Sequence, residues 1–400
     1  MTRRRSSGAR PGRPATAAPG EDSNGTIDEV ERSAPSICVL NWGSSKNVAV
    51  RKESHAMKEV TTIGLDLAKN VFQVHGVGMD NVPLFNRKLR RSEVLRFFEK
   101  IPPCLVGLEA CGSAHYWARE IARFGHDVRL IPPKYVKPYV KRGKTDAADA
   151  EAISEAVTRK NMRFVPIKSA EQQAAAMVLK TRTLLVKQRT QLINALRAHL
   201  AELGIIAGVG AEKVSSLLSI VRDEDDSRLP RAARFGLMIV AEQIETLDKR
   251  IAQLEHAIVS EVKRDEDARR LTTVPGVGPI TAATVKALVP DPAGFQSARH
   301  FAAWLGLTPR PHSSGGKARL AGISKMGNPE LRSLLVVGAT AILRYARTNP
   351  NARPWLKALL ERRPFKVVAV AVANKMARTI WALLNRGGIY RDSDLRSPAA

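Results

Sequence analysis

Cysteine is scarce in this sequence, and the few that occur exclude two kinds of architecture. The chain has three cysteines, Cys38, Cys104 and Cys111, among its 400 residues. Their spacing offers no paired metal ligands and no disulfide framework, so neither a structural zinc site nor a disulfide-stapled secreted fold is expected. A small, odd number of cysteines is typical of proteins in a reducing cytoplasm.

The sequence also has no apolar run that we interpret as long enough to cross a membrane. The apolar stretch at residues 367–373 is too short for a span and is flanked by charged residues. We therefore expect a soluble cytoplasmic protein without a membrane partner.

Acidic residues are few relative to basic ones. The 38 aspartates and glutamates face 64 lysines and arginines, which gives a formal net charge of +26 and a pI near 10.5. A surplus of this size predicts a polyanionic partner, with nucleic acid as the first candidate. The length and the hydrophobic content of 44% suffice for two or three domains with sizeable cores.

The first 57 residues differ from the rest of the chain. They are rich in Arg, Ser, Pro, Gly and Ala and show no sustained apolar period, so residues 1–57 are predicted to form a disordered basic extension. A secretory signal would need an apolar core, which the segment lacks. It is either a basic nucleic-acid tail or the result of a start assigned upstream of Met57, and we favour the second interpretation. Residues 393–400 are predicted to be a disordered tail.

Residues 58–165 alternate between strand-like and helix-like segments. A three-strand meander comes first, because short β-rich runs are separated by turn signals such as Asp80-Asn81. Three hairpin-linked strands followed by alternating helices and strands predict a ribonuclease-H-like α/β domain. The expected strands are residues 63–67, 71–77, 82–89, 104–108 and 127–131, and the expected helices are residues 92–101, 114–124 and 147–158.

Four acids fall on elements of this domain that would bring them together. Asp66 and Glu109 each end an apolar run, and Asp146 and Asp149 are three residues apart on an expected helix, so they share one face. If the two strands are neighbours and the helix packs across their ends, the four carboxylates converge. Such a cluster repels itself unless divalent cations are present, and oxygen-only ligation favours Mg²⁺ or Mn²⁺. Two such ions clamp the attacking and leaving oxygens of a phosphodiester.

Each acid taken alone has an ordinary explanation. An Asp after a strand is most often a turn residue or a helix cap, and an Asp-x-x-Asp pair is common at solvated helix starts. Residues 63–70 also resemble the first phosphate loop of actin-like sugar kinases and chaperone ATPases. That fold needs further glycine-rich phosphate turns, which the sequence lacks between residues 76 and 158. The order of the four acids therefore favours a shared metal site.

Residues 166–265 are predicted to be a helical, charge-rich linker. Leucines recur through residues 172–203, and apolar residues recur in steps of three and four through residues 234–262, as in a coiled coil. An intramolecular helical hairpin and a dimerising coiled coil explain this pattern equally well. Residues 204–210 and the acidic cluster at residues 223–226 mark the expected turn.

Residues 266–392 are expected to form a mostly helical C-terminal domain. The segment containing Gly276 and Gly278 has the Pro-Gly-x-Gly turn of a helix-hairpin-helix module, in which exposed amides at a helix N-terminus bind phosphate. An ordinary glycine-rich helix connection is the alternative. A glycine-rich basic loop follows at residues 311–320. From composition alone, its serines are expected only to make turns. Four basic residues in or next to this loop are either phosphate clamps or simply solvated: Arg310, Lys317, Arg319 and Lys325.

Motifs in fixed order along both halves resemble one group of proteins. They are GLDLAK at residues 64–69, LEACG at 108–112, KTDAADA at 144–150, VPGVG at 274–278, GLTP at 306–309, SG at 314–315 and KMGN at 325–328. The chain resembles bacterial insertion-sequence transposases of the one-ten family, which join a RuvC-like DEDD domain to a C-terminal transposase domain with a serine nucleophile. The resemblance covers roughly residues 61–390.

The resemblance implies a recombinase that excises and inserts its own element. Asp66, Glu109, Asp146 and Asp149 would bind Mg²⁺ or Mn²⁺, and Ser314 would attack the DNA phosphate to form a covalent intermediate that conserves the bond energy. It further implies double-stranded DNA at element ends and target as partners, a structured noncoding guide RNA, and a nucleoid-associated place in the bacterial cytoplasm. Joining two DNA ends needs more than one site, so a homodimer or tetramer is expected.

Three points stay open in the sequence. Ser313 replaces Ser314 as the nucleophile if the loop register differs. A metal-dependent RuvC-like junction nuclease, cutting by water attack with a purely structural serine loop, is the alternative enzyme. A catalytically inactive nucleic-acid-binding protein is the third class. Removing Ser314 separates the first two enzymes, because only the nuclease would keep cutting.

Overall fold

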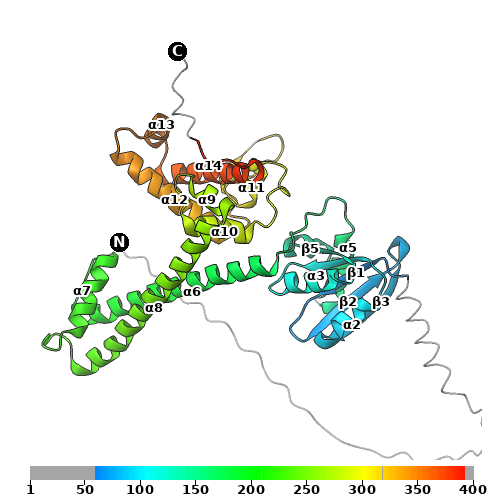
Figure 1. Cartoon of the computed structure of the whole chain (residues 1–400), viewed down its shortest axis with the longest axis horizontal. Coiled ribbons are helices and arrows are strands. Elements are labelled where there is room, and N and C mark those ends of the chain that lie inside the picture. Colours follow the sequence, from blue (N-terminus) through cyan, green and yellow to red (C-terminus); the bar gives the residue numbers. More distant parts are fainter. Residues whose placement is uncertain (1–58, 142, 144, 209, 318, 392–400) are drawn as a thin grey trace, which may run out of the picture. The chain divides into compact units, whose positions relative to one another are not determined.

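The computed structural model describes residues 59–141, 143, 145–208, 210–317 and 319–391 (Figure 1). The predicted N-terminal extension, residues 1–57, and the predicted C-terminal tail, residues 393–400, lie outside these ranges.

A mixed five-stranded sheet with the order β3-β2-β1-β4-β5 organises the N-terminal part. β1 (Thr62–Asp66) pairs antiparallel with β2 (Val71–Val77), and β2 pairs antiparallel with β3 (Pro83–Arg90). On its other side β1 pairs in parallel with β4 (Leu105–Glu109), which pairs in parallel with β5 (Asp127–Ile131). The meander and the two later strands predicted from the sequence are confirmed, and the parallel strands are joined by helical crossovers, as parallel pairing requires.

Helices cover both faces of this sheet. The helices are α2 (Val94–Glu99), α3 (Ala114–Ala122), α4 (Pro133–Val136), which the sequence did not predict, and α5 (Asp146–Val157). Successive residues of β2 point to opposite faces. The Phe72 ring packs edge-on against Trp117 of α3, with centroids 5.1 Å apart, whereas Nδ1 of His75 lies 2.9 Å from Oγ of Ser154 on α5. α3 and α5 therefore lie on opposite sides of the sheet.

A pair of glycines allows α5 to lie directly on the sheet. Gly64 of β1 is the register partner of Gly107 of β4. A Cβ atom on Gly64 would lie 2.1 Å from the carbonyl oxygen of Ala150, and one on Gly107 would lie 2.8 Å from Cβ of Val157. The absence of both side chains lets the helix backbone contact the strands, and this contact fixes where the first turn of α5 lies.

We expect Gly64→Ala to lower the free energy of unfolding by about 3 kcal/mol, because the added methyl group forces α5 away from β1. Gly112→Ala is the matched control, since a Cβ there meets no atom within 4 Å. Urea unfolding of the two variants measures the difference. Equal stability of both variants would show that α5 is not held in this close contact.

Two long helices form an antiparallel pair in the central segment. They are α6 (Ala170–Glu202) and α8 (Arg231–Arg264). Arg182 pairs with Glu255 and Arg189 with Asp248, so residues later in α6 meet residues earlier in α8. α7 (Ala211–Arg222) lies at the end where the two are joined, in a region that the sequence predicted only as a turn (Figure 1). The intramolecular hairpin is thus present, and a dimerising coiled coil stays a prediction.

The C-terminal part is mostly helical, as predicted. Its hydrophobic core also contains Ala176 and Leu179 of α6 and Ile258 and Val262 of α8, so one core crosses the domain boundary that the sequence placed after residue 265. The elements are α9 (Glu266–Thr272), α10 (Pro279–Leu288), α11 (Ala298–Trp304), β6 (Pro309–Pro311), β7 (Leu320–Ile323), α12 (Pro329–Thr348), α13 (Pro354–Arg362) and α14 (Phe365–Arg386).

One helix corrects the expectation that no segment reaches membrane-spanning length. α14 is long and apolar enough by length and composition, with a mean hydropathy of 1.5 over a window that is 44% buried. Its Val368, Val372 and Met376 lie in the C-terminal core, and the helix packs against α11 and α12. The sequence indicates only residues 367–373 of this helix as an apolar stretch, because charged residues flank them. Its apolar character is explained by burial inside this core.

Candidate functional site

The four predicted acids lie at one edge of the five-stranded sheet. Asp66 and Glu109 end the neighbouring parallel strands β1 and β4. Asp146 and Asp149 occupy the first turn of α5, which packs on both strands. Oγ1 of Thr145 caps this helix by accepting a hydrogen bond from the Ala148 amide at 3.2 Å. Strand order, helix capping and the glycine contact together bring acids from three elements to the same place.

Burial and like charge act in the same direction at this edge. Burial raises the pKa of Asp66 from 3.8 to about 6, and the charges of Asp149, Asp146 and Glu109 add to the rise. The pKa of Glu109 is also raised, first by burial and then by the charge of Asp149. The charged forms of these carboxylates are therefore destabilised, and a bound cation would relieve the repulsion.

The four acids offer the oxygen donors that a divalent cation needs, but they are not grouped closely enough to form a metal site by geometry. Within the described ranges, no three His, Cys, Asp or Glu side chains are grouped so that they could hold a metal ion. The four carboxylates nevertheless offer only oxygen donors, which Mg²⁺ and Mn²⁺ prefer, and their mutual repulsion favours a positive ion between them. Asp66, Glu109, Asp146 and Asp149 remain the residues that could hold such an ion.

Sequence reasoning missed the polar contact that ties α5 to β2. The Ser154 hydroxyl donates to the carbonyl of Glu151 at 2.7 Å, so it accepts from Nδ1 of His75 at 2.9 Å, which fixes the imidazole tautomer. Burial lowers the pKa of His75. The signal available in the sequence was only a polar residue in a buried strand, and its partner lies 79 residues away.

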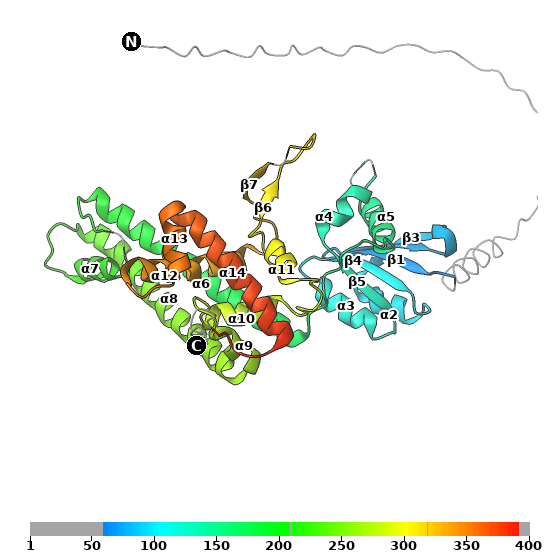
Figure 2. The same ribbon diagram turned by 90° about the horizontal axis from the view of Figure 1, so that it is seen from above.

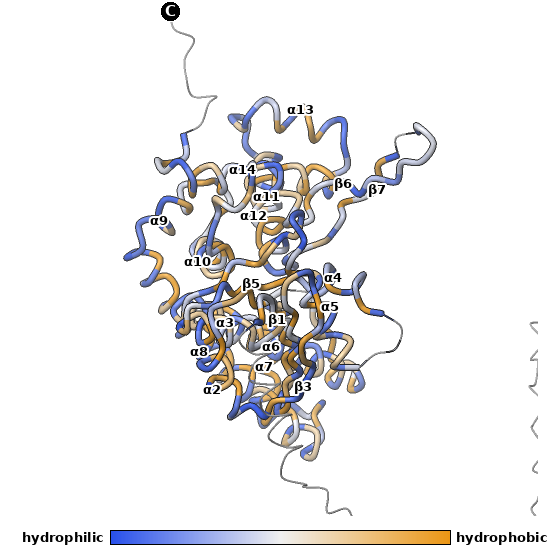
Figure 3. The backbone as a smooth tube through the Cα atoms, turned by 90° about the vertical axis from the view of Figure 1, so that its right-hand side faces the viewer, coloured by the Kyte–Doolittle hydropathy of each residue, from blue (hydrophilic) through white to orange (hydrophobic). Residues whose placement is uncertain are grey.

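The predicted serine loop is the tip of a β-hairpin. β6 and β7 pair antiparallel, and beyond them the Lys317 amide donates to the Ser314 carbonyl at 3.1 Å. Gly315 and Gly316 between them have φ of +55° and +76°, which a tight two-residue hairpin turn requires and glycine adopts without strain. Figure 2 shows the hairpin projecting from the helices, and Figure 3 shows its tip in polar and pale colours.

The two candidate serines differ in their surroundings, although both are exposed. Oγ of Ser313 accepts a hydrogen bond from the Arg319 amide at 3.4 Å. In the described chain no residue bonds the Ser314 hydroxyl, which is therefore free to meet a ligand. The four predicted phosphate-binding residues are also exposed, and none of them forms an ion pair with another described residue: Arg310, Lys317, Arg319 and Lys325.

The base of the hairpin is held by close backbone contacts. Gly306 and Gly327 have φ of +71° and +80°, and a Cβ on Gly327 would lie 1.7 Å from the Trp304 carbonyl oxygen. Nη1 of Arg332 donates to the carbonyls of Leu305 and Met326 at 3.0 and 3.1 Å. The two chain segments that enter and leave the hairpin are thereby joined, and Arg332 gains a positioning role that the sequence did not reveal.

The predicted helix-hairpin-helix turn has one inward and one outward glycine. Gly276, with φ of +78°, packs against α12, where an added Cβ would lie 2.9 Å from the Gly338 carbonyl oxygen. Gly278 is exposed at the start of α10, and a Cβ there would meet no atom within 4 Å. The structure therefore gives Gly276 a packing role and leaves Gly278 accessible. Phosphate binding by this turn stays a prediction.

Comparisons with known proteins agree along both halves of the chain. The family model for transposases of the IS116/IS110/IS902 family matches residues 268–358, and a second transposase model, for IS110 transposases of the DEDD type, matches residues 63–205. A probable family 20 transposase of Pseudomonas aeruginosa is 50% identical over 83% of this chain and 99% of its own length. The transposase for insertion sequence element IS1111A of Coxiella burnetii is 40% identical over 85% of this chain and 94% of its own. A pilin gene-inverting protein of Moraxella bovis is 25% identical over 82% of this chain and 96% of its own.

Proposed function

The chain belongs to the IS116/IS110/IS902 family of transposases, and we propose that it cleaves and joins DNA through a covalent bond between Ser314 and a DNA phosphate, assisted by Mg²⁺ at the acidic edge. The family assignment supports a DNA-cleaving and recombining enzyme of an insertion sequence. The observation that carries the finer proposal is the convergence of Asp66, Glu109, Asp146 and Asp149 at one edge of the sheet.

The sheet order supports a RuvC-like assignment for the N-terminal domain. The sequence resemblance implied a layout of three antiparallel strands followed by two parallel ones. In that layout the acids lie at the ends of the first and fourth strands and on α5, as they do here. Within this assignment, Mg²⁺ would supply a Lewis acid that polarises the phosphate and stabilises charge on its oxygens. The chain's own contribution is to hold the four carboxylates at the ends of rigid elements.

In this proposal Ser314 acts as the nucleophile. Its oxygen would form a bond to phosphorus while the bond from phosphorus to a deoxyribose oxygen breaks, and the hydroxyl proton would pass to that leaving oxygen. The number of phosphoester bonds stays the same, so a hydroxyl from another DNA strand can later reverse the step and release the serine. Arg310, Lys317, Arg319 and Lys325, exposed along the same hairpin, would bind the flanking phosphates.

Guide RNA and assembly belong to the same proposal. The net charge of +26 supports a large polyanionic partner set, which double-stranded DNA and a noncoding RNA would together supply. Two DNA ends need two serines, so we propose a homodimer or a tetramer.

A denaturing gel tests the function directly. Purified protein, Mg²⁺, labelled element-end DNA and RNA transcribed from the element's flanks are expected to give a protein-DNA adduct. Leaving out the RNA tests guidance: an equal yield of adduct without RNA would remove that part of the proposal. Cleaved DNA without any adduct would point to the junction nuclease.

The pH dependence of stability tests the acidic edge independently of catalysis. The pKa of Asp66 is higher in the folded chain, about 6, than the ordinary value of 3.8. Between these values the folded state holds the proton more tightly than the unfolded state, so the contribution of Asp66 to stability falls as the pH rises through this window. With EDTA present, we expect the melting temperature of the wild type, compared with Asp66→Asn, to decline from about pH 4 to about pH 7.

Mg²⁺ at neutral pH should restore the melting temperature of the wild type and leave that of Asp66→Asn unchanged. The reason is that the cation offsets the repulsion between the acids once Asp66 has lost its proton. Parallel melting curves for the two proteins across this pH range would show that neither burial nor the other three acids raises the pKa of Asp66.

A further inference from the structure

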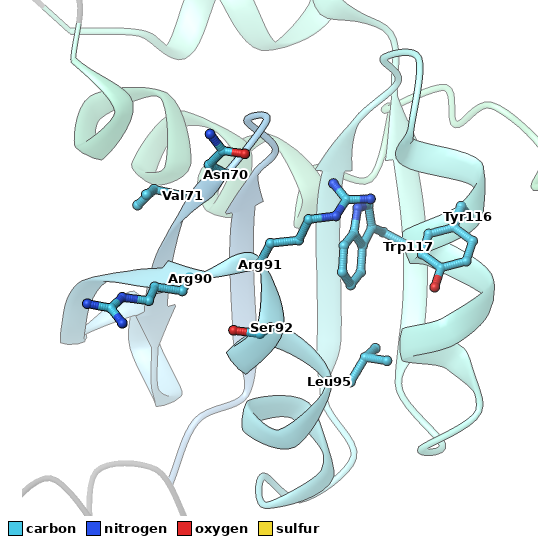
Figure 4. Close-up of a pocket in the computed structure, with 8 residues that line it drawn as sticks. All are labelled: Asn70, Val71, Arg90, Arg91, Ser92, Leu95, Tyr116 and Trp117. Atoms are coloured by element: carbon cyan, nitrogen blue, oxygen red, sulfur yellow. The ribbon is translucent and has the colours of Figure 1, made fainter.

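A cavity of about 670 Å³ lies on the face of the sheet opposite α5. Its walls come from the start of β2, the segment that follows β3 up to Leu95 of α2, and the first turn of α3, and Figure 4 shows the side chains that line it. Arg91 contributes a guanidinium group, and Tyr116 and Trp117 contribute two rings. The Arg90 side chain points away from them, toward the face of its register partner Val71. Cationic and aromatic side chains in one cavity are the combination that unpaired nucleotides bind.

The wall of the cavity contains one buried hydrogen-bond donor that lacks an acceptor. Trp117 is only 3% exposed, and its indole Nε1 has no hydrogen-bond partner. Cζ of Arg91 lies 5.0 Å from the centroid of this ring, with the guanidinium beside the indole in Figure 4. Arg91 forms no ion pair within the described ranges. A buried donor without a partner is costly. Solvent does not reach Nε1 in this structure, so an anionic oxygen bound by the guanidinium would meet the indole N–H after a shift of the side chains around it.

Tyr116 offers a stacking surface next to these donors. Its side chain is 42% exposed, and its ring contacts Trp117 edge-on with centroids 5.3 Å apart. An aromatic ring held in place by a buried neighbour loses little freedom when a base stacks on it. The phosphate-binding donors and the stacking ring are therefore adjacent on α3 and in the segment that follows β3.

The cavity lies at the same edge of the sheet as the acids. Asn70, which lines it, follows Asp66 by four residues, and its carbonyl accepts from the Arg91 amide at 2.9 Å. Glu109 ends β4, and the chain then enters α3, which carries Tyr116 and Trp117. The cavity and the carboxyl ends of β1 and β4 therefore lie at the same end of the sheet.

We propose that this cavity binds one unpaired nucleotide of a nucleic-acid strand. Arg91 and the indole N–H of Trp117 hold its phosphate, and the exposed ring of Tyr116 stacks on its base. The inference goes beyond the proposed function, since it requires neither the serine nor the metal. It assigns the α/β domain a binding site for single strands that is separate from its carboxylates.

Fluorescence anisotropy with the full chain in EDTA tests the site. The probes are an unstructured pyrimidine oligonucleotide as DNA, the same sequence as RNA, and a DNA duplex. Trp117→Phe keeps a ring but removes the N–H, and we expect it to weaken single-strand binding about tenfold, the effect of one hydrogen bond to a charged group. Arg91→Ala and Tyr116→Leu, both at exposed positions, are each expected to weaken it by a similar factor of about ten.

Arg87→Ala is the matched control. It removes the same charge from β3, and its guanidinium also lies over a ring, that of Phe97 at 4.9 Å, but it does not line the cavity. It should leave single-strand affinity within about twofold of the wild type. Duplex binding should be nearly unchanged in Trp117→Phe and Tyr116→Leu, because a paired base cannot stack on Tyr116. A loss confined to the DNA or to the RNA probe identifies which strand the site holds.

Two outcomes would overturn the proposal. Unchanged single-strand binding in Arg91→Ala and Tyr116→Leu, both still folded by their melting temperatures, would show that the cavity holds no nucleotide. Equal losses in Arg87→Ala and Arg91→Ala would show that the effect is one of net charge alone. Photo-cross-linking of an iodopyrimidine oligonucleotide, followed by peptide mass spectrometry, should place the adduct on Tyr116, and an adduct elsewhere would contradict the assignment.

Discussion

Replacing Ser314 by alanine is expected to remove the covalent protein-DNA adduct and to reduce strand exchange by about a thousandfold or more. The reason is that alanine has no oxygen to bond to phosphorus, while the exposed hairpin turn that carries it depends on Gly315 and Gly316 and should not change. Binding of element-end DNA should therefore persist in the variant. The measurement is a denaturing gel for the adduct, with strand-exchange products quantified in parallel.

Ser313→Ala is the matched control for this prediction. Ser313 is the adjacent exposed residue, and its hydroxyl accepts a bond from the Arg319 amide within the hairpin. The variant should retain the adduct. If Ser313→Ala loses the adduct and Ser314→Ala keeps it, the nucleophile is the other serine. If free cleaved DNA persists in Ser314→Ala without an adduct in the wild type, the protein is a metal-dependent nuclease.

Replacing Asp149 by asparagine is expected to abolish Mg²⁺-dependent cleavage and to weaken Mg²⁺ binding by about a hundredfold or more. Asp149 is the leading charged neighbour of Asp66 and the charged neighbour of Glu109, so it is central to the electrostatics of the acidic edge. Asparagine preserves shape and removes the charge. The pKa of Asp66 should fall toward its ordinary value for the same reason. Mg²⁺ titration calorimetry and a cleavage assay measure the two effects.

Glu151→Gln controls for the loss of an acid from the same helix. Glu151 follows Asp149 by two residues, but its carboxylate pairs with Lys141 at 2.5 Å instead of facing the other acids. Its removal should leave Mg²⁺ binding and cleavage within about threefold of the wild type. Full activity in Asp149→Asn would refute the metal site, whereas equal losses in the two variants would indicate a structural effect on α5.

The two predictions fail in distinguishable ways. Loss of the adduct in both Ser314→Ala and Asp149→Asn supports one mechanism in which serine attack depends on the acids. An adduct that persists in Asp149→Asn would separate the serine from the carboxylates and leave the acidic edge without a role in cleavage.

The order of the strands and of the longer helices in the N-terminal part could be predicted from the sequence alone, whereas the short α4 was missed. Short β-rich runs, turn residues and helix caps are local signals, so the ends of β1 and β4 and the start of α5 were placed within a few residues. Acids at the ends of these elements then predicted a common site, because strand ends and helix starts meet at the edges of sheets. The same local character explains why the periodic residues of α6 and α8 indicated helices but left their partner undecided.

Only the tertiary structure decided which residues far apart in the chain come into contact. The apolar residues of α14 belong to a core, Gly276 packs against Gly338, and Ser154 reaches His75. The cavity beside Trp117 joins residues from β2, β3 and α3, so no local pattern reveals it. Hydrophobic periodicity and helix capping depend on neighbours within a few residues of the chain. Cavities and unsatisfied hydrogen-bond donors depend on how whole helices and strands pack.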